Sequence, residues 1–177
     1  SLGQAAALTI MVCDLTIGKE KWESGWDIAN KALPICVKIM SRAGELADLD
    51  SDAFDDVMAA YRMPKGDEKE IIIRKESIEK SSIVATEIPF ETSKLALEIL
   101  EILPELALKG NGNAVSDVGV AGLLASAACK GALFNVDINL SGLSDDVATE
   151  IRKESPNILK MSRALSRQIM DNVRERL

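Results

Sequence analysis

The sequence predicts an all-α protein, a bundle of about six or seven helices, and two observations lead to this prediction. Apolar residues recur at alternating steps of three and four along most of the chain, which places them on one face of a helix. Almost no segment alternates apolar and polar residues in the way that a strand does. The 177 residues are 47% hydrophobic and 28% charged, which is a globular composition. This length suits one domain, so we expect residues 1–177 to fold as a single unit.

The first two helices follow from their apolar residues. Residues 5–16 are mostly apolar and end near Gly18, a residue that suits a helix C-terminus. Residues 26–47 then carry an apolar stripe so wide that we expect a bundle helix buried on more than one side. Pro34 lies within this stripe and predicts a kink or a break there.

The middle of the chain predicts three more helices. Residues 51–62 again place apolar side chains at three-four spacing, and residues 63–66 (Met-Pro-Lys-Gly) form a connector. A charged helix follows over residues 67–84. The next helix begins near Pro89, which fits a first turn, and continues to about residue 109.

The last third predicts two helices of different character. Residues 110–113 (Gly-Asn-Gly-Asn) form a turn, and residues 117–135 are so rich in Gly and Ala that neighbouring backbones can approach closely. Residues 134–140 alternate and fit either an extended segment or a continuation of this helix. A long final helix starts after Ser144, a good N-cap, and is interrupted at Pro156.

Composition and charge exclude several classes of partner. The net charge is −7 and aromatic residues make up 3%, so the chain lacks the basic surface and the stacking rings of a nucleic-acid binder. The longest apolar runs, residues 5–13 and 118–129, are short compared with the roughly 20 residues of a membrane-spanning helix. We therefore expect neither nucleic acid nor a membrane as a partner.

The chain contains no histidine, which excludes a Ser-His-Asp triad, a Cys-His pair and a mixed Cys/His zinc site. The three cysteines, Cys13, Cys36 and Cys129, are scattered and do not form a disulfide framework. They indicate a reducing compartment, the cytoplasm. Any catalysis must therefore depend on carboxylates, amines, hydroxyls, amides or backbone groups.

Acidic residues gather in one segment, at Asp48, Asp50 and Asp52, with Asp55 and Asp56 behind them. One interpretation is a solvated start of a helix, where acids interact favourably with the helix dipole. The other is a site in which one of these carboxyls acts as a general acid or base.

Three further segments allow a structural or a binding role. Residues 110–117 form either a loop with Ser116 as N-cap or a substrate loop that ends at Asp117. Residues 16–21 form either a polar helix end or a binding segment. Asn135 and Asn139 lie four residues apart and fit amides that bond to neighbouring helices inside a bundle.

Six segments occur in an order and at a spacing that resemble a known family. They are Leu15-Thr16-Ile17-Gly18-Lys19, Asp48-x-Asp50-x-x-Ala53-Phe54, Arg62-Met63-Pro64-Lys65, Glu87-Ile88-Pro89-Phe90-Glu91, Asn111-x-x-x-x-Ser116-Asp117 and Phe134-Asn135-Val136-x-Ile138-Asn139-Leu140. Together they resemble the cyclodeaminase domain of formimidoyltransferase-cyclodeaminase and the single-domain methenyltetrahydrofolate cyclohydrolases. The resemblance covers nearly the whole chain, and the last two segments are the most specific.

This resemblance implies a homodimeric enzyme that acts on the one-carbon unit at N5 and N10 of tetrahydrofolate. The folate is its substrate, and neither a separate cofactor nor a metal is implied. The family's proton donor falls on Asp50, and Asp117 would support or orient the substrate. Six further residues would contact the folate: Thr16, Lys19, Lys65, Asn111, Asn135 and Asn139.

The resemblance leaves three functions open. The first is a cyclodeaminase, in which N10 attacks the 5-formimino carbon and ammonia leaves to give 5,10-methenyltetrahydrofolate. The second is a cyclohydrolase, in which water opens the methenyl ring to the 10-formyl form. The third is a helical dimer that binds folate without turnover. The family usually has a Gly-Gly-Gly-Ser turn just before the first helix, whereas this sequence begins within that helix, which gives the third function weight.

Overall fold

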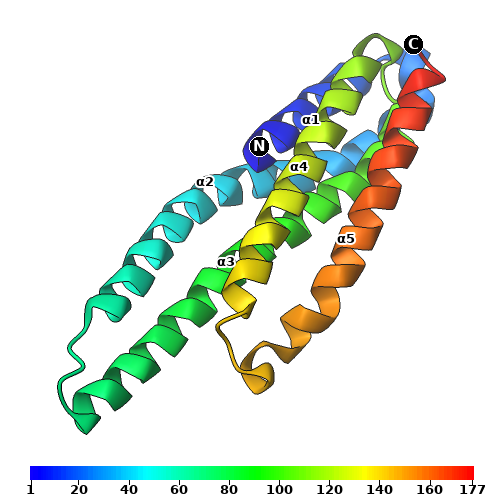
Figure 1. Cartoon of the computed structure of the whole chain (residues 1–177). Coiled ribbons are helices and arrows are strands. Elements are labelled where there is room, and N and C mark those ends of the chain that lie inside the picture. The colour runs from blue at the N-terminus through cyan, green and yellow to red at the C-terminus, as the bar shows by residue number, and fades with distance from the viewer.

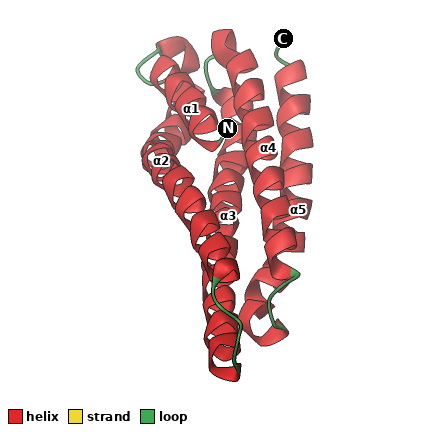
Figure 2. Ribbon diagram, turned by 60° about the vertical axis from the view of Figure 1, so that its left-hand side comes forward, coloured by secondary structure: helices red, strands yellow, loops and turns green.

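The computed structural model describes the backbone of residues 1–177 and every side chain except those of residues 145–147. All regular structure in this described chain is helical, and Figure 2 shows no strand, so the all-α prediction is confirmed. The elements are α1 (Leu2–Thr16), η1 (Glu20–Gly25), α2 (Trp26–Arg62), α3 (Glu68–Lys109), η2 (Gly112–Ala114), α4 (Val115–Leu140) and α5 (Asp145–Arg174).

The described chain has five α-helices, not six or seven, because two pairs of predicted helices are continuous. Residues 26–47 and 51–62 both belong to α2, so the acidic segment lies within a helix and not at its start, and residues 67–84 and 89–109 both belong to α3. Pro34 lies inside α2, and Pro89 and Pro104 lie inside α3. A proline removes one backbone hydrogen bond from a helix. Pro89 and Pro104 are buried, so the burial of their rings offsets part of this loss.

The helical alternative for residues 134–140 is correct, since α4 continues to Leu140. The N-cap of α4 is Ala114, so Ser116 lies in the first turn instead of capping the helix. The small residues of α4 allow the close approach that the sequence predicted. A Cβ atom added to Gly122 would lie 2.9 Å from Cγ2 of Ile169 in α5.

The five helices form a bundle with α3 and α4 at its centre. Helix α3 packs against α2, α4 and α5, and α1 packs against α2 and α4. The main core joins all five helices and includes fully buried residues such as Val12, Cys36, Leu103, Val118 and Ile169. Helix α2 packs against both α1 and α3 and is therefore buried on more than one side, as its wide apolar stripe predicted.

Helices α2 and α3 extend together beyond the other helices, as Figures 1 and 2 show. We call residues 47–87 the arm, which consists of the end of α2, the connector and the start of α3. A separate small core of Leu46, Ala53 and Ile88 lies where the arm leaves the bundle. At the tip, the Asp67 carboxylate accepts a 2.8 Å hydrogen bond from Glu70 N–H and begins α3.

One segment of the described residues, Gly112–Leu140, is long and apolar enough to cross a membrane by length and composition alone, with a mean hydropathy of 1.4. The apolar run considered in the sequence, residues 118–129, is shorter because it ends at Asp117 and Lys130, and the longer segment includes both charges. In the structure, 56% of this segment's most apolar window is buried against the rest of the protein. Such burial is typical of a core helix.

Candidate functional site

An open cavity of about 330 Å³ lies where the arm leaves the bundle. Four helices line it: the first residues of α1, the segment Ala43–Asp50 of α2, Pro89 and Thr92 of α3, and the segment 127–135 of α4. Much of the α4 wall consists of Gly and Ala, whose small side chains leave the space open.

The cavity brings together two of the residues that the sequence singled out. Asp50 reaches it from α2 and Asn135 from α4, and both side chains are exposed to solvent. Thr92 of α3 lies on the same wall as Pro89, and its hydroxyl donates a 3.1 Å hydrogen bond to the Ile88 carbonyl. The cavity therefore offers a carboxyl group, an amide and a hydroxyl to one bound molecule.

A hydrogen bond between α4 and α3 fixes the neighbourhood of Asn135. Asn139 lies one helical turn after it and donates from Nδ2 to the carbonyl oxygen of Ala85 at 2.7 Å. Asn139 is thus one of the two amides predicted to bond to a neighbouring helix, whereas Asn135, the other, is exposed. The bond uses one of the two N–H donors of the Asn139 amide, so the second N–H and the amide oxygen are available to a ligand.

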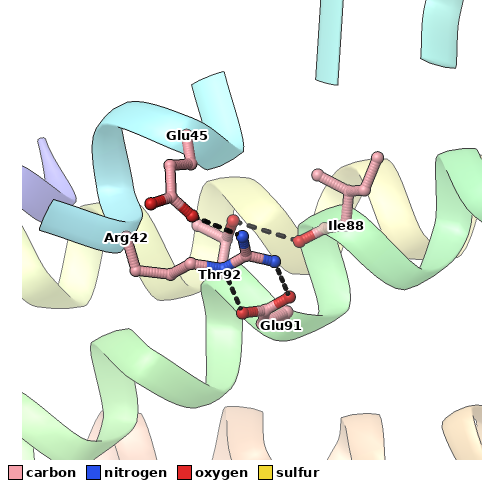
Figure 3. A network of polar contacts seen from close by, with 5 residues as sticks. All are labelled: Arg42, Glu45, Ile88, Glu91 and Thr92. Carbon is pink, nitrogen blue, oxygen red and sulfur yellow. Dashed lines mark hydrogen bonds and ion pairs between the residues drawn. The ribbon is translucent and has the colours of Figure 1, made fainter. Parts of the chain in front are cut away.

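An ion-pair network joins α2 to α3 beside the cavity (Figure 3). Nε and Nη2 of Arg42 donate to the two carboxylate oxygens of Glu91 at 2.8 and 3.0 Å, and Nη1 donates to Oε2 of Glu45 at 2.7 Å. The next residues along the two helices, Ala43 and Thr92, line the cavity. We call the Arg42–Glu91 pair the clamp.

The charges of the clamp stabilise each other. Its hydrogen bonds from Arg42 hold the pKa of the Glu91 carboxyl below its ordinary value. The same bonds raise the pKa of the Arg42 guanidinium. Both groups therefore stay charged at neutral pH, and the two-pronged geometry is maintained.

Thr16 and Asn111 form a second polar cluster, at the other end of α1. The buried Thr16 hydroxyl donates to Val12 O at 2.7 Å and accepts a 3.0 Å hydrogen bond from the backbone N–H of Asn111. Nδ2 of Asn111 donates to Leu15 O at 2.7 Å, and its Oδ1 accepts from Asn113 N–H at 2.9 Å. These contacts tie the end of α1 to the turn between α3 and α4.

The predicted site residues thus fall in three places. Lys19 and Asp117 belong to the same end of the molecule as the Thr16–Asn111 cluster, and Lys19 is exposed while Asp117 is half-buried. A helix rises 1.5 Å per residue, so Thr16 lies about 20 Å along α1 from the cavity. Lys65 is in the connector at the tip of the arm, about 18 Å or more along α2 from Asp50.

Sequence reasoning did not single out Arg42, Glu91 or Thr92. Glu91 belongs to the Glu87–Glu91 segment of the resemblance, which was a usable signal. Arg42 stands among the apolar residues of α2 with no motif around it. Its pairing with a residue 49 positions away depends on how α2 packs against α3, so only the structure could reveal it.

A second groove of about 670 Å³ lies between α2 and α3, and its lining includes Pro34, Leu95, Glu98 and the clamp itself. None of the predicted site residues lines this groove. Among the residues whose side chains are described, no group of three or more Cys, Asp or Glu side chains is arranged to hold a metal ion. The cavity at the base of the arm is therefore the candidate site.

Comparison with known proteins identifies the family of the chain. Residues 2–157 match the formiminotransferase-cyclodeaminase family. A methenyltetrahydrofolate cyclohydrolase from Methylorubrum extorquens is 36% identical over 174 residues, which cover 97% of this chain and 83% of that protein. A formimidoyltransferase-cyclodeaminase from Sus scrofa is 26% identical over 172 residues, and the chain spans 32% of its length.

The fold also matches a solved structure. The crystal structure of formiminotetrahydrofolate cyclodeaminase from Thermotoga maritima superposes with a TM-score of 0.77 and 26% identity, over 99% of this chain and 83% of that one. The sequence segments, the helical bundle and the matched family agree with one another. The chain therefore belongs to the formiminotransferase-cyclodeaminase family of enzymes.

Proposed function

We propose that this protein is a methenyltetrahydrofolate cyclohydrolase, with Asp50 as its proton-transfer group. The observation that carries this proposal is the meeting of Asp50 and Asn135 in one cavity at the base of the arm. The choice of reaction is supported by the cyclohydrolase that is 36% identical over most of both chains. The choice of catalytic group is supported by the resemblance and by the absence of histidine from the sequence.

The proposed reaction needs one group that both accepts and donates a proton. Water attacks the methenyl carbon while the Asp50 carboxylate takes one of its protons, and a neutral tetrahedral carbon between N5 and N10 results. The bond to N5 then breaks as protonated Asp50 returns the proton to N5. The hydroxyl on the carbon loses its proton to solvent and becomes the carbonyl of the 10-formyl group. A single carboxyl can serve as base and then acid in this sequence.

Asn135 and Thr92 are proposed to position the folate. An amide can both donate to and accept from the pterin's nitrogen and carbonyl groups. The Thr92 hydroxyl already donates to Ile88 O, so it can only accept a hydrogen bond from the substrate. Thr16, Lys19, Lys65, Asn111 and Asp117 do not line the cavity, and the proposed function does not depend on their contact with folate.

Formimidoyltetrahydrofolate cyclodeaminase activity, which the resemblance placed first, is the second candidate function. The superposition on the Thermotoga maritima cyclodeaminase supports it. The same carboxyl could protonate the departing ammonia after N10 attacks the formimino carbon. Both reactions pass through a tetrahedral carbon between N5 and N10, so one cavity could serve either.

Two substrates offered separately distinguish the candidates. A cyclohydrolase removes the absorbance of 5,10-methenyltetrahydrofolate, whereas a cyclodeaminase creates that absorbance from 5-formiminotetrahydrofolate and releases ammonia. We expect the first result. Turnover of the formimino substrate alone would favour the second candidate, and folate binding without either reaction would favour a non-catalytic dimer.

We propose that the protein works as a homodimer, as the resemblance implies. Large apolar side chains stand exposed on the outer faces of two packed helices, with Met11 and Leu15 on α1 and Val120 and Leu123 on α4. Such a surface is typical of a protein–protein interface. Sedimentation should give twice the mass of the chain, and Leu123→Glu should give the mass of one chain. A parent protein that sediments as one chain would contradict the proposal.

A further inference from the structure

The clamp joins α2 to α3 near the place where the arm leaves the bundle. Arg42 lies four residues before Leu46 in α2, and Glu91 lies three residues after Ile88 in α3, so both are on the bundle side of the arm's small core. Asp50 lies two turns beyond Arg42, on the arm. The clamp is therefore placed between the bundle and the segment that carries the carboxyl.

The cavity residues on the two sides of the clamp come from different helices. Thr92 and Pro89 belong to α3, next to Glu91, and Asp50 belongs to α2, eight residues after Arg42. Where the arm begins, the core between α2 and α3 is limited to a cluster of small size around Leu46, Ala53 and Ile88. A shift of α2 against α3 would move Asp50 relative to Thr92.

The clamp has the geometry to prevent such a shift. Two parallel hydrogen bonds of 2.8 and 3.0 Å fix the orientation of the guanidinium as well as its distance from the carboxylate. The third bond, from Nη1 to Glu45 at 2.7 Å, holds the same guanidinium to its own helix. Figure 3 shows Arg42 held between Glu45 and Glu91 in this way.

We infer that Arg42 and Glu91 are positioning residues that hold Asp50 at its working distance from the folate bound against α3 and α4. This inference rests on the proposed function, since it assigns a role only if Asp50 transfers the proton. The clamp does not touch the reacting atoms in this role. It determines the rate through the position of Asp50, and a displacement of about 1 Å can lower a rate by about a hundredfold.

The first test is Glu91→Gln, assayed for methenyl hydrolysis well below the melting temperature. It should lower kcat by at least about tenfold and leave KM within about threefold, because Asn135 and Thr92 still hold the substrate. Glu105→Gln is the matched control, since it removes a surface ion pair with Lys109 far from the cavity, and its kcat should equal that of the parent. An unchanged kcat in Glu91→Gln would overturn the inference.

Two further variants separate positioning from general loss of structure. In the double variant Arg42→Glu with Glu91→Arg, the guanidinium is on α3. It faces the new carboxylate at position 42 and the Glu45 carboxylate, both on α2, so most of the lost kcat should return. In the Asp50→Asn background, Glu91→Gln should cause no further fall in kcat, because the clamp acts through Asp50. A full additional fall in that background, or no recovery in the exchanged pair, would overturn the inference.

The same assays separate failure of the inference from failure of the proposed function. If Asp50→Asn abolishes turnover while Glu91→Gln retains the parent kcat, only the positioning role is wrong. If Asp50→Asn itself retains the parent kcat, the assignment of Asp50 is wrong, and the positioning role falls with it.

Discussion

Asn139 of α4 donates a 2.7 Å hydrogen bond to the Ala85 carbonyl of α3. This carbonyl has no helical N–H donor, because the residue four positions later is Pro89. A proline cannot donate to the carbonyl four residues before it. The amide of a neighbouring helix supplies the missing donor. Pro89 thus frees an acceptor on α3 to which α4 hydrogen-bonds, and α3 continues through the proline.

Asn139→Leu should lower the free energy of unfolding by about 1 kcal/mol, because the Ala85 carbonyl loses its donor in a half-buried place. Urea denaturation followed by circular dichroism measures the change. Asn30→Leu is the control, since the Asn30 amide is exposed and bonds only to its own helix, and its unfolding free energy should change little. Parent stability together with a raised KM would instead make Asn139 a folate contact.

Thr16→Val should lower the free energy of unfolding by about 1–3 kcal/mol and leave kcat and KM unchanged. Valine has nearly the shape of threonine but leaves the buried N–H of Asn111 without its acceptor. Thr9→Val is the control, because the hydroxyl of Thr9 is buried but donates to a carbonyl of its own helix. A raised KM in Thr16→Val would show that this end of α1 contacts the folate.

The fold could be predicted from the sequence because three-four spacing reports helices directly. The continuity of α3 through Pro89 could not, because a proline ends a helix only when nothing compensates for its missing hydrogen bond. Asn139 compensates at Pro89, and it lies 50 residues further along the chain. Local rules contain no information about such a distant donor.

The cysteine thiols should resist alkylation in the native protein. Burial raises the pKa of Cys13 to about 12 and that of Cys36 to about 11, so almost no thiolate forms near neutral pH. Iodoacetamide at pH 8 should therefore leave both unmodified by mass spectrometry until the protein is unfolded in urea. Rapid labelling of native protein at Cys13 or Cys36 would contradict this burial.

The stabilisation from the clamp should disappear in acid. The pKa of Glu91 is lowered in the folded state, so its contribution is present above the ordinary carboxyl pKa of about 4.3 and is lost as the pH falls through the folded value. The parent should therefore melt slightly above Glu91→Gln between pH 5 and 8. The two melting temperatures should converge as the pH falls through the lowered pKa of Glu91. A difference that grows in acid would contradict the assignment.

The candidate site could be predicted only in part. Asp50 and Asn135 belong to segments that carry the family resemblance, and the structure places both at the cavity. Thr16 and Asn111 also belong to segments of the resemblance, yet their hydrogen bonds join α1 to the turn before α4. A sequence motif does not distinguish a polar residue that binds a ligand from one that bonds to another part of the chain.

The central claim is that catalysis occurs in the cavity at the base of the arm, and kcat of Asp50→Asn measured beside Asp117→Asn tests it most directly. Asp117 begins α4 about 15 Å along the helix from the cavity wall, so one chain cannot use both carboxyls on a single carbon atom. Asp50→Asn should lower kcat for methenyl hydrolysis by at least about a hundredfold with parent folate binding. Asp117→Asn should keep the parent kcat and lose less than about 1 kcal/mol of stability. Parent turnover in Asp50→Asn, with loss of turnover in Asp117→Asn, would contradict the account.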